Sequence, residues 1–256
     1  MRPHKRGWAT SIMFYVVFWI ALLATAVLLI GAIGTFFTNL SGRSLLSLDW
    51  SGYVVASDFT NPQPVITSLS GSWVVPKVNV SQKDTFSAAW IGIGGQSDQT
   101  LIQTGTEHDS INGTEVYYAW YELLPNDSIA IDVINVSVRD KITASINLVN
   151  SATNEWSIEI EDVTKGQKFS QNFIYDSSRL SAGWVVERPT VDSTLSTLAM
   201  FGTVTFTNAS VTVNAQTGSI SSFPFSQVIM TNRQNTQLVI VSSLTSKGSS
   251  FTVTYA

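Results

Sequence analysis

The side chains that most often perform catalysis are scarce in this sequence, and their scarcity limits its chemistry. It has no cysteine and two histidines, His4 and His108. Disulfides, thiol nucleophiles, iron–sulfur clusters and cysteine-ligated zinc are therefore excluded. A catalytic zinc held by two or three histidines of one chain is excluded as well. We accordingly expect no metal and no cofactor.

Serine and aspartic chemistries also lack their usual signatures. The sequence contains neither Gly-x-Ser-x-Gly nor Asp-Thr-Gly. A Ser–His–Asp triad would have to use His108, because His4 precedes a long apolar segment. A single histidine between Glu107 and Asp109 is typical of a solvated turn, so we do not expect His108 to be catalytic.

Three glutamates offer carboxylate chemistry. Glu155, Glu159 and Glu161 alternate along E-W-S-I-E-I-E (155–161) and share one strand face, as the carboxylate pair of a glycosidase would require. The alternative is an ordinary half-buried strand, with its Trp and Ile residues inward and its Glu residues outward. We favour the ordinary strand.

Two further groups stand out by position. Gln103 lies in L-I-Q-T-G (101–105), where an aspartic peptidase would have its Asp-Thr-Gly, and Glu187 closes W-V-V-E (184–187). Taken alone, Gln103 is typical of a surface hydrogen-bonding residue. Glu187 beside Arg188 is, by itself, typical of a solvated ion pair.

Six short motifs resemble, in order and approximate spacing, those of the glutamic peptidases, also called eqolisins. They are D-W-S-G (49–52), W-I-G-I (90–93), L-I-Q-T-G (101–105), Y-A-W-Y-E (118–122), W-V-V-E (184–187) and F-G-T-V-T-F (201–206). Each motif alone is weakly specific, but chance rarely produces six in this order. The resemblance implies an all-β fold, a concanavalin-like jelly-roll sandwich of two seven-stranded antiparallel sheets.

The same resemblance implies an acid-acting endopeptidase with Gln103 and Glu187 as its catalytic residues. A glutamate can take a proton from the attacking water and return it to the leaving amine. A glutamine amide can stabilise the oxyanion, and its carbonyl can help to hold the water. A glutamate with a pKa of about 4.3 stays partly ionised in acid, where a histidine base would be protonated.

Strand alternation indicates which matched residues can line the same groove. Trp120 and Glu122 share a face within 118–124, and Trp90 can form a wall of the site. Gly92 leaves room for a substrate backbone, as do Gly94 and Gly95. We therefore expect substrate contacts from Trp90, Gly92, Trp120, Glu122 and Glu107.

Several positions depart from the family pattern. Gly94 and Gly183 stand where the family often has an acidic residue, and Glu107 replaces an aspartate. Leu123 and Leu124 replace a second aromatic pair. These differences could change which substrates are preferred and which residues hold the site in place, but they leave Gln103 and Glu187 unchanged.

The elements that must position these residues are strands. Short alternating runs separated by Gly-containing turns predict a large sandwich or barrel with no long amphipathic helix after the apolar segment. The expected strands span 72–78, 86–93, 116–124, 129–138, 141–149, 156–160, 169–175, 200–213, 238–243 and 251–255.

The segment 12–36 is apolar and long enough to span a bilayer, within a charge-free stretch from Gly7 to Gly42. A buried helix and a cleaved signal peptide are the alternatives, but the run is longer than a usual signal-peptide core. We expect a cytoplasmic tail (1–11), a transmembrane signal anchor (12–36), a linker (37–48) and an extracytoplasmic β-sandwich peptidase domain (49–256).

The flanking charges predict the orientation. Arg2, Lys5 and Arg6 precede the segment, so the N-terminus is expected in the cytoplasm and the sandwich outside, single-pass in the cell membrane or secreted if the anchor is cleaved. Six N-x-[ST] sequons follow the segment and agree with glycosylation: Asn39, Asn79, Asn112, Asn126, Asn135 and Asn208.

Composition also limits the partners. The formal net charge is −4, only 12% of residues are charged, and basic residues form no run beyond the first six. Nucleic acid is therefore not expected as a partner, whereas protein or peptide substrates and the membrane are. Two other functions stay open: a non-catalytic membrane-anchored sandwich that binds glycans or proteins, and a jelly-roll glycosidase.

Overall fold

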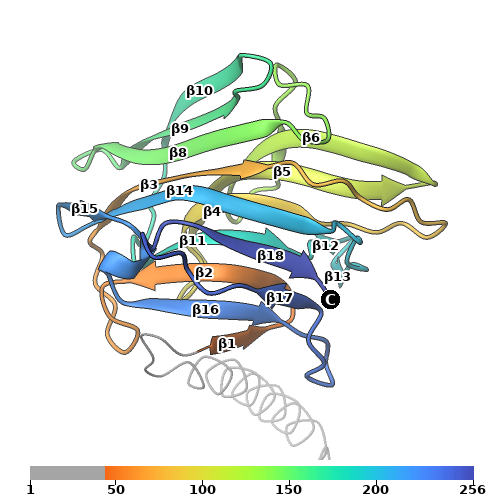
Figure 1. Ribbon diagram of the computed structural model, residues 1–256. Helices are drawn as coiled ribbons and strands as arrows, with labels where there is room; N and C mark the ends of the chain where they lie inside the picture. The colour runs from red at the N-terminus through yellow and green to blue at the C-terminus, as the bar shows by residue number, and fades with distance from the viewer. Residues whose placement is uncertain (1–43) are drawn as a thin grey trace, which may run out of the picture. The chain divides into compact units, whose positions relative to one another are not determined.

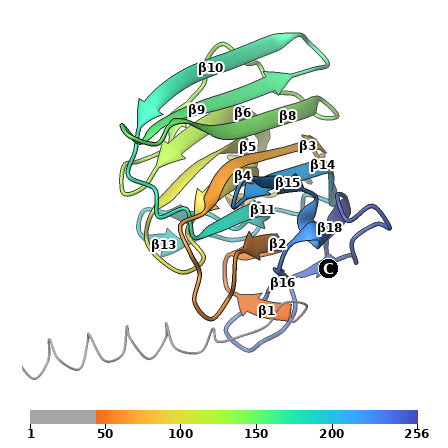
Figure 2. The same cartoon turned by 90° about the vertical axis from the view of Figure 1, so that its left-hand side faces the viewer.

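The computed structural model describes residues 44–256, and this part of the chain is built from strands with no α-helix. Two sheets pack face to face as layers, and they can be followed in two orthogonal views (Figures 1 and 2). The all-β prediction is confirmed. Within the described residues, no helix is long and apolar enough to cross a membrane. The expected tail, the expected anchor at 12–36 and Asn39 lie outside the described residues.

The first sheet carries most of the matched motifs. Its eight strands are, in spatial order, β1 (Ser44–Ser47), β16 (Phe225–Met230), β2 (Trp50–Ala56), β11 (Ser181–Glu187), β4 (Ala88–Gly94), β5 (Leu101–Ile111), β6 (Thr114–Leu123) and β7 (Ile129–Ala130). Neighbours in it are antiparallel except β1 and β16, which are parallel. Because β1 pairs with β16, the sheet begins inside the stretch expected to be a linker.

The second sheet forms the other layer. Its strands run in the order β10 (Gln167–Ile174), β9 (Glu155–Asp162), β8 (Lys141–Asn150), β3 (Ile66–Val74), β14 (Thr203–Val213), β18 (Phe251–Tyr255) and β17 (Val239–Val241), with β15 (Gln216–Gly218) paired to β14. A short hairpin of β12 (Thr190–Val191) and β13 (Thr194–Leu195) and a 3₁₀ turn, η1 (Ile220–Ser222), complete the described elements. Each sheet therefore has eight strands in the described residues, rather than the seven that the resemblance implied.

Buried aromatic side chains hold the two sheets together. Trp184 on β11 donates its indole N–H to the carbonyl of Ser70 on β3 at 2.8 Å. Trp73 on β3 donates to the hydroxyl of Thr106 on β5 at 2.9 Å. Both indoles are at most 1% exposed, so each buries a large apolar surface and pairs its polar atom across the layers. A chain without cysteines depends on such packing instead of cross-links.

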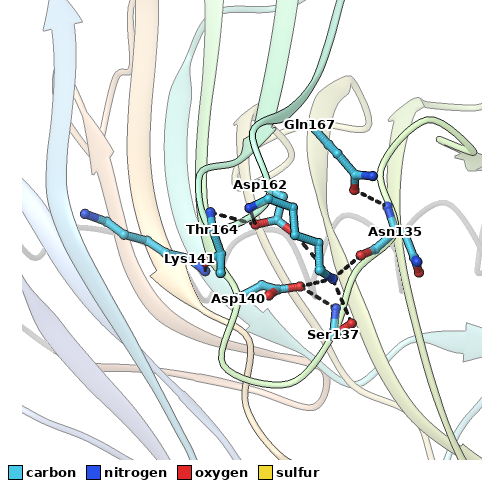
Figure 3. A network of polar contacts seen from close by, with 8 residues as sticks. Asn135, Ser137, Asp140, Lys141, Asp162, Thr164 and Gln167 are labelled. Atoms are coloured by element: carbon cyan, nitrogen blue, oxygen red, sulfur yellow. Dashed lines mark hydrogen bonds and ion pairs between the residues drawn. The ribbon is translucent and has the colours of Figure 1, made fainter.

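The expected strands 72–78 and 129–138 are wrong for most of their length, and in the first of them strand structure ends at Val74. Within 129–138, strand structure is limited to β7, although Ile131, Ile134 and Val136 are buried in the core. Ile131 N–H still donates to the carbonyl of Ala119 on β6 at 2.8 Å, but beyond it the backbone bonds largely to side chains. Asn135 N–H donates to Gln167 Oε1 at 2.8 Å, and Ser137 N–H donates to Asp140 Oδ2 at 2.6 Å (Figure 3).

Lys165, in the turn between β9 and β10, ties this loop to the second sheet. Its ammonium contacts the carbonyl of Asn135, the hydroxyl of Ser137 at 2.7 Å and Asp140 Oδ2 at 2.6 Å. Asp162, which is fully buried, accepts the backbone N–H of Thr164 at 2.9 Å and lies 3.7 Å from the same ammonium. A buried carboxylate pair with one cation is costly to break, so the loop has a fixed path.

Candidate active site

The strand register brings the expected site residues to one face of the first sheet. Directly paired residues of antiparallel strands point to the same face. Three parallel rows therefore cross β2, β11, β4, β5 and β6. They are Val54–Gly183–Gly92–Gln103–Glu122, then Gly52–Val185–Trp90–Gly105–Trp120, then Trp50–Glu187–Ala88–Glu107–Tyr118. All seven residues proposed from the sequence lie in these rows.

This face is turned away from the second sheet. Its apolar residues form a cluster of their own around Trp90, Trp120 and Val185, with Trp50 and Leu124 packed against it. The alternate residues of the same strands, such as Ile91 and Trp184, belong instead to the core between the sheets. The alternation expected for 101–105, 118–124 and 184–187 is therefore confirmed. The register adds that their site-facing sides coincide in space.

Gln103 is held in the first row by its neighbour on β6. It is 4% exposed, and its amide nitrogen donates to Glu122 Oε2. Its carbonyl oxygen Oε1 is buried and has no partner within residues 44–256. Trp120 Nε1, in the second row, is likewise buried without a partner in that range. One free acceptor and one free donor on this face match the N–H and C=O groups of a peptide.

Tyr175 fixes the ends of the strands that carry Gln103 and Glu122. Its hydroxyl accepts the backbone N–H of Leu101 at 2.8 Å and donates to the carbonyl of Leu124 at 2.9 Å. Leu124 N–H in turn donates to the carbonyl of Leu101 at 3.0 Å. The pairing of Gln103 with Glu122 therefore rests on a braced pair of strand ends.

Glu187 ends β11 in the third row, and its carboxyl group contacts Trp90 of the second row. Its Oε2 accepts the indole N–H of Trp90 at 2.6 Å, and Trp90 packs edge-on against Trp50 with ring centroids 4.9 Å apart. Arg188 does not pair with it; the guanidinium donates to the carbonyl of Leu48 at 2.5 Å. The solvated ion pair that the sequence alone would suggest is therefore wrong.

Burial and neighbouring charges shift the pKa values of the glutamates on this face. Burial, followed by repulsion from Asp49 and Glu122, raises the pKa of Glu187 to about 8, although the hydrogen bond from Trp90 opposes the shift. Burial also raises the pKa of Glu122. The expectation of an ordinary glutamate pKa near 4.3 is therefore wrong for Glu187, which holds its proton throughout the acidic range.

Glycines contribute differently from our expectation. A Cβ added to Gly92 would lie 2.9 Å from Leu101 Cδ1, 3.0 Å from Gln103 Cβ and 3.0 Å from a ring atom of Trp90. The space above Gly92 is thus filled by the site's own side chains rather than left for a substrate backbone. Gly94 and Gly95 have positive φ angles of 101° and 83° and form the turn after β4.

His108 is not a solvated turn residue. It lies within β5, is fully buried, and points into the core, where its Nε2 lies 2.8 Å from the hydroxyl of Thr106. Burial lowers its pKa to about 3. It is on the face opposite to Gln103, so it takes no part in the candidate site.

The three alternating glutamates lie elsewhere. Trp156, Ile158 and Ile160 are buried between the sheets, so Glu155, Glu159 and Glu161 face outward from the second sheet, as expected for an ordinary half-buried strand. Glu159 pairs with Lys168 at 2.9 Å. This arrangement gives no support to a glycosidase carboxylate pair.

The sequence reasoning missed two neighbours of the expected residues. Asp109 is 2% exposed, lies two residues from Glu107 on the same strand face, and hydrogen-bonds to it. Trp50, within the motif 49–52, sits opposite Glu187. The i, i+2 spacing of Glu107 and Asp109 was the available signal for the first, because alternate residues of a strand share a face.

We expect the stability of the fold to be greatest near pH 4.5. Glu187 and Asp109 have pKa values raised to about 8 and about 7, so their contribution is fully present below about pH 4 and is lost as the pH rises through these values. His108, with its lowered pKa, acts in the opposite sense, and stability is lost as the pH falls from about 6.5 toward 3.

Thermal melts of the chain between pH 2.5 and 8.5 test this. At about 2–4 °C for each kcal/mol in a domain of this size, the melting temperature at pH 8 should lie at least about 5 °C below its maximum. A melting temperature that rises steadily from pH 4.5 to pH 8 would contradict the assignment of neutral buried carboxyls.

Comparison with known proteins agrees with this geometry. The sequence model of the peptidase A4 family matches residues 48–255. Aspergillopepsin-2 of Aspergillus niger is 29% identical over 233 residues, covering 82% of this chain and 78% of that protein. Scytalidopepsin B of Scytalidium lignicola is 29% identical over 201 residues, covering 73% and 72%. The crystal structure of scytalido-glutamic peptidase with a transition-state analogue inhibitor is similar with a TM-score of 0.69 at 25% identity, covering 82% of this chain and 99% of that one.

Proposed function

Because the chain belongs to the peptidase A4 family, we propose that it is an endopeptidase in which Glu187 transfers protons and Gln103 stabilises the oxyanion. The observation that carries this proposal is the shared sheet face, on which Gln103 and Glu187 lie two strands apart with Trp90 between them. Relatives described as glutamic peptidases bind transition-state analogues, which supports peptide substrates for this chain. The interleaved strand order also supports the jelly-roll description of the sandwich.

The proposed reaction uses both oxygens of the Glu187 carboxyl group. Water attacks the peptide carbonyl carbon while one carboxyl oxygen accepts a proton from that water, and the proton on the other oxygen passes to the leaving nitrogen as the C–N bond breaks. Over one turnover Glu187 gains one proton and loses one. It therefore ends in the state in which it began, and the products are a carboxylic acid and an amine.

Gln103 supports the same step from β5, two strands away from Glu187. Its second amide hydrogen is not used by Glu122 and can donate to the carbonyl oxygen as negative charge develops there. Its free Oε1 can accept a hydrogen bond from the attacking water. Trp90 lies between the two residues, and Trp120 on β6 packs in the same apolar cluster, which supports their expected contacts with substrate.

We expect hydrolysis of an unfolded protein to be fastest in acid and to decline as the pH rises toward 8, because Glu187 then loses the proton that the leaving nitrogen needs. Thiol reagents, chelators and serine-directed reagents should have no effect. Inhibitors built for paired aspartates should bind poorly, since Gln103 offers no carboxyl group. A pH–rate profile repeated with each inhibitor class measures this. A maximum at or above neutral pH, or loss of activity with a chelator, would overturn the mechanism.

We also propose that the sandwich acts outside the cell, tethered by the segment 12–36 or secreted after its cleavage. The charge-free segment and the flank of Arg2, Lys5 and Arg6 support this orientation. Asn79, Asn112, Asn126, Asn135 and Asn208 are exposed, which makes them accessible to glycosylation.

Protease added to intact cells should therefore digest the sandwich while an N-terminal tag stays protected. Permeabilised cells, in which the tag is also cleaved, provide the control. Protection of the C-terminal domain in intact cells would contradict the proposed topology.

A further inference from the structure

The amide group of Gln103 can take two orientations that differ in what they offer a substrate. A half-turn about the bond between Cγ and Cδ exchanges the places of the amide nitrogen and oxygen at little steric cost. The proposed reaction uses an N–H of this amide as the oxyanion donor and its Oε1 as an acceptor for water. A substrate placed to receive the N–H in one orientation would meet Oε1 in the other, so a neighbouring group has to select one of them.

Glu122 is the only polar side chain beside Gln103 in its row of the first sheet. On the β4 side the row continues with Gly92 and Gly183, which carry no side chain, and then with the apolar Val54. On the β6 side Glu122 pairs directly with Gln103, which brings their Cβ atoms to about 5 Å. Oε2 of Glu122 accepts the amide nitrogen of Gln103. Within this row, selection of the amide orientation therefore falls to Glu122.

The two side chains have no competing partners in the described part of the chain. Within residues 44–256, the carboxyl group of Glu122 forms no other hydrogen bond and no ion pair. Oε1 of Gln103 is buried without a partner there. A carboxylate oxygen accepts hydrogen bonds but cannot donate them, so the amide nitrogen, not the oxygen, has to face Glu122.

The strands that carry the pair are tied together on both sides of it. Thr104 donates its hydroxyl to the carbonyl of Trp120 at 2.7 Å. Beyond Gln103, the hydroxyl of Tyr175 joins the backbone N–H of Leu101 to the carbonyl of Leu124. The carboxyl group is therefore kept within reach of the amide by the backbone as well as by their own contact.

We propose that Glu122 is a positioning residue that holds the Gln103 amide with its nitrogen toward β6 and thereby sets the places of the oxyanion donor and of Oε1. This role rests on the proposed function, and it takes the place of the substrate contact that the sequence suggested for Glu122. It does not depend on the charge of Glu122. In a protonated Glu122 the carbonyl oxygen still accepts the amide N–H, and the hydroxyl can donate to Oε1.

Two replacements of Glu122 separate positioning from substrate binding. Glu122→Met keeps the length of the side chain but removes the carboxyl acceptor. It should lower kcat by about 10–100-fold, the factor for one lost hydrogen bond to a charged group, with KM changed by less than about twofold. Glu122→Gln still accepts the amide N–H and can donate to Oε1, so it should lower kcat by no more than about threefold. A residue that binds substrate through its charge would instead raise KM in both variants.

A residue that acts through Gln103 should have no effect once Gln103 is gone. The double variant Gln103→Ala/Glu122→Met should therefore have a kcat within about twofold of that of Gln103→Ala alone. Losses that multiply would show an independent role for Glu122 and overturn the proposal. Glu161→Met, on the outer face of the second sheet, is the matched control and should leave kcat and KM unchanged.

The side-chain amide signal of Gln103 tests the contact without any activity. It is observed by NMR on the full chain with ¹⁵N-labelled glutamine and is identified by its loss in Gln103→Ala. The hydrogen that faces the carboxyl group should resonate downfield of ordinary glutamine amides, lose this shift in Glu122→Met and keep most of it in Glu122→Gln. An ordinary signal in the unchanged chain, or the same signal in all three chains, overturns the proposal.

The two readouts keep this proposal distinct from the proposed function. A chain that hydrolyses no peptide at any pH would contradict the proposed function, yet the amide signal would still test the hold on Gln103. A chain that loses kcat in Gln103→Ala but not in Glu122→Met would contradict only the role of Glu122. If thermal melts show that Glu122→Met does not fold, Glu122→Gln decides, and a loss as large as that of Gln103→Ala overturns the role.

Discussion

Replacing Glu187 by glutamine is expected to reduce the turnover of a peptide substrate by at least about 10²–10⁴-fold at every pH, because the amide can neither accept the proton of water nor donate one to the leaving nitrogen. The change preserves the shape of the side chain, and the introduced amide oxygen can still accept the indole N–H of Trp90. The fold should therefore persist, and steady-state kinetics together with a thermal melt at pH 4.5 would separate lost chemistry from lost structure.

Glu159→Gln provides the matched control for this experiment. Glu159 lies on the second sheet, where it is paired with Lys168 at 2.9 Å, and its pKa is lowered by that contact. An exposed pair of this kind contributes little to stability, so both activity and fold should be retained. Full activity of Glu187→Gln would reject the assignment, and inactivation by Glu159→Gln would redirect it to β9.

Much of the site could be predicted from the sequence because strand alternation is local. The side chains of Gln103, Trp120 and Glu122 have their faces set by a period of two, and the structure confirms each of these. The same period showed that Trp156 and its alternate neighbours point inward on β9. The family resemblance supplied the remaining step, since it identified which strands matter.

The environment of each side chain could not be read in the same way. Whether Glu187 meets Arg188 or Trp90 depends on how β11 pairs with β4, which links residues about a hundred positions apart. His108 carries two charged neighbours in sequence, yet they point to one face of β5 while the imidazole points to the other and is buried. Alternation predicts opposite faces, but both faces of β5 are buried by residues distant in sequence, so no local pattern indicates the burial of His108.

The failed strand at 129–138 has a related cause. Ile131, Ile134 and Val136 are buried, as apolar residues of a strand would be, whereas Ile129 and Val133 are exposed. However, backbone groups can also be satisfied by side chains, and here Gln167, Asp140 and Lys165 supply the partners. These three residues follow the segment in sequence and lie in or next to the strands of the second sheet, so no local pattern could indicate them.

Replacing Gln103 by alanine is expected to lower kcat by about 10²–10³-fold with little change in KM, because the amide donates to an oxygen whose charge develops only in the transition state. Gln171→Ala on β10, whose side chain is exposed on the second sheet, is the matched control and should behave as the unchanged chain.

Loss of Gln103 also frees Glu122 from the hydrogen bond that opposes the rise of its pKa. Glu122 should therefore titrate at a higher pH in the variant, which carboxyl NMR can detect independently of activity. An unchanged kcat alongside this shifted titration would show that Gln103 holds Glu122 without stabilising the oxyanion. The mechanism would then need another donor on this face, and Trp120 Nε1, which has no partner within residues 44–256, is the candidate.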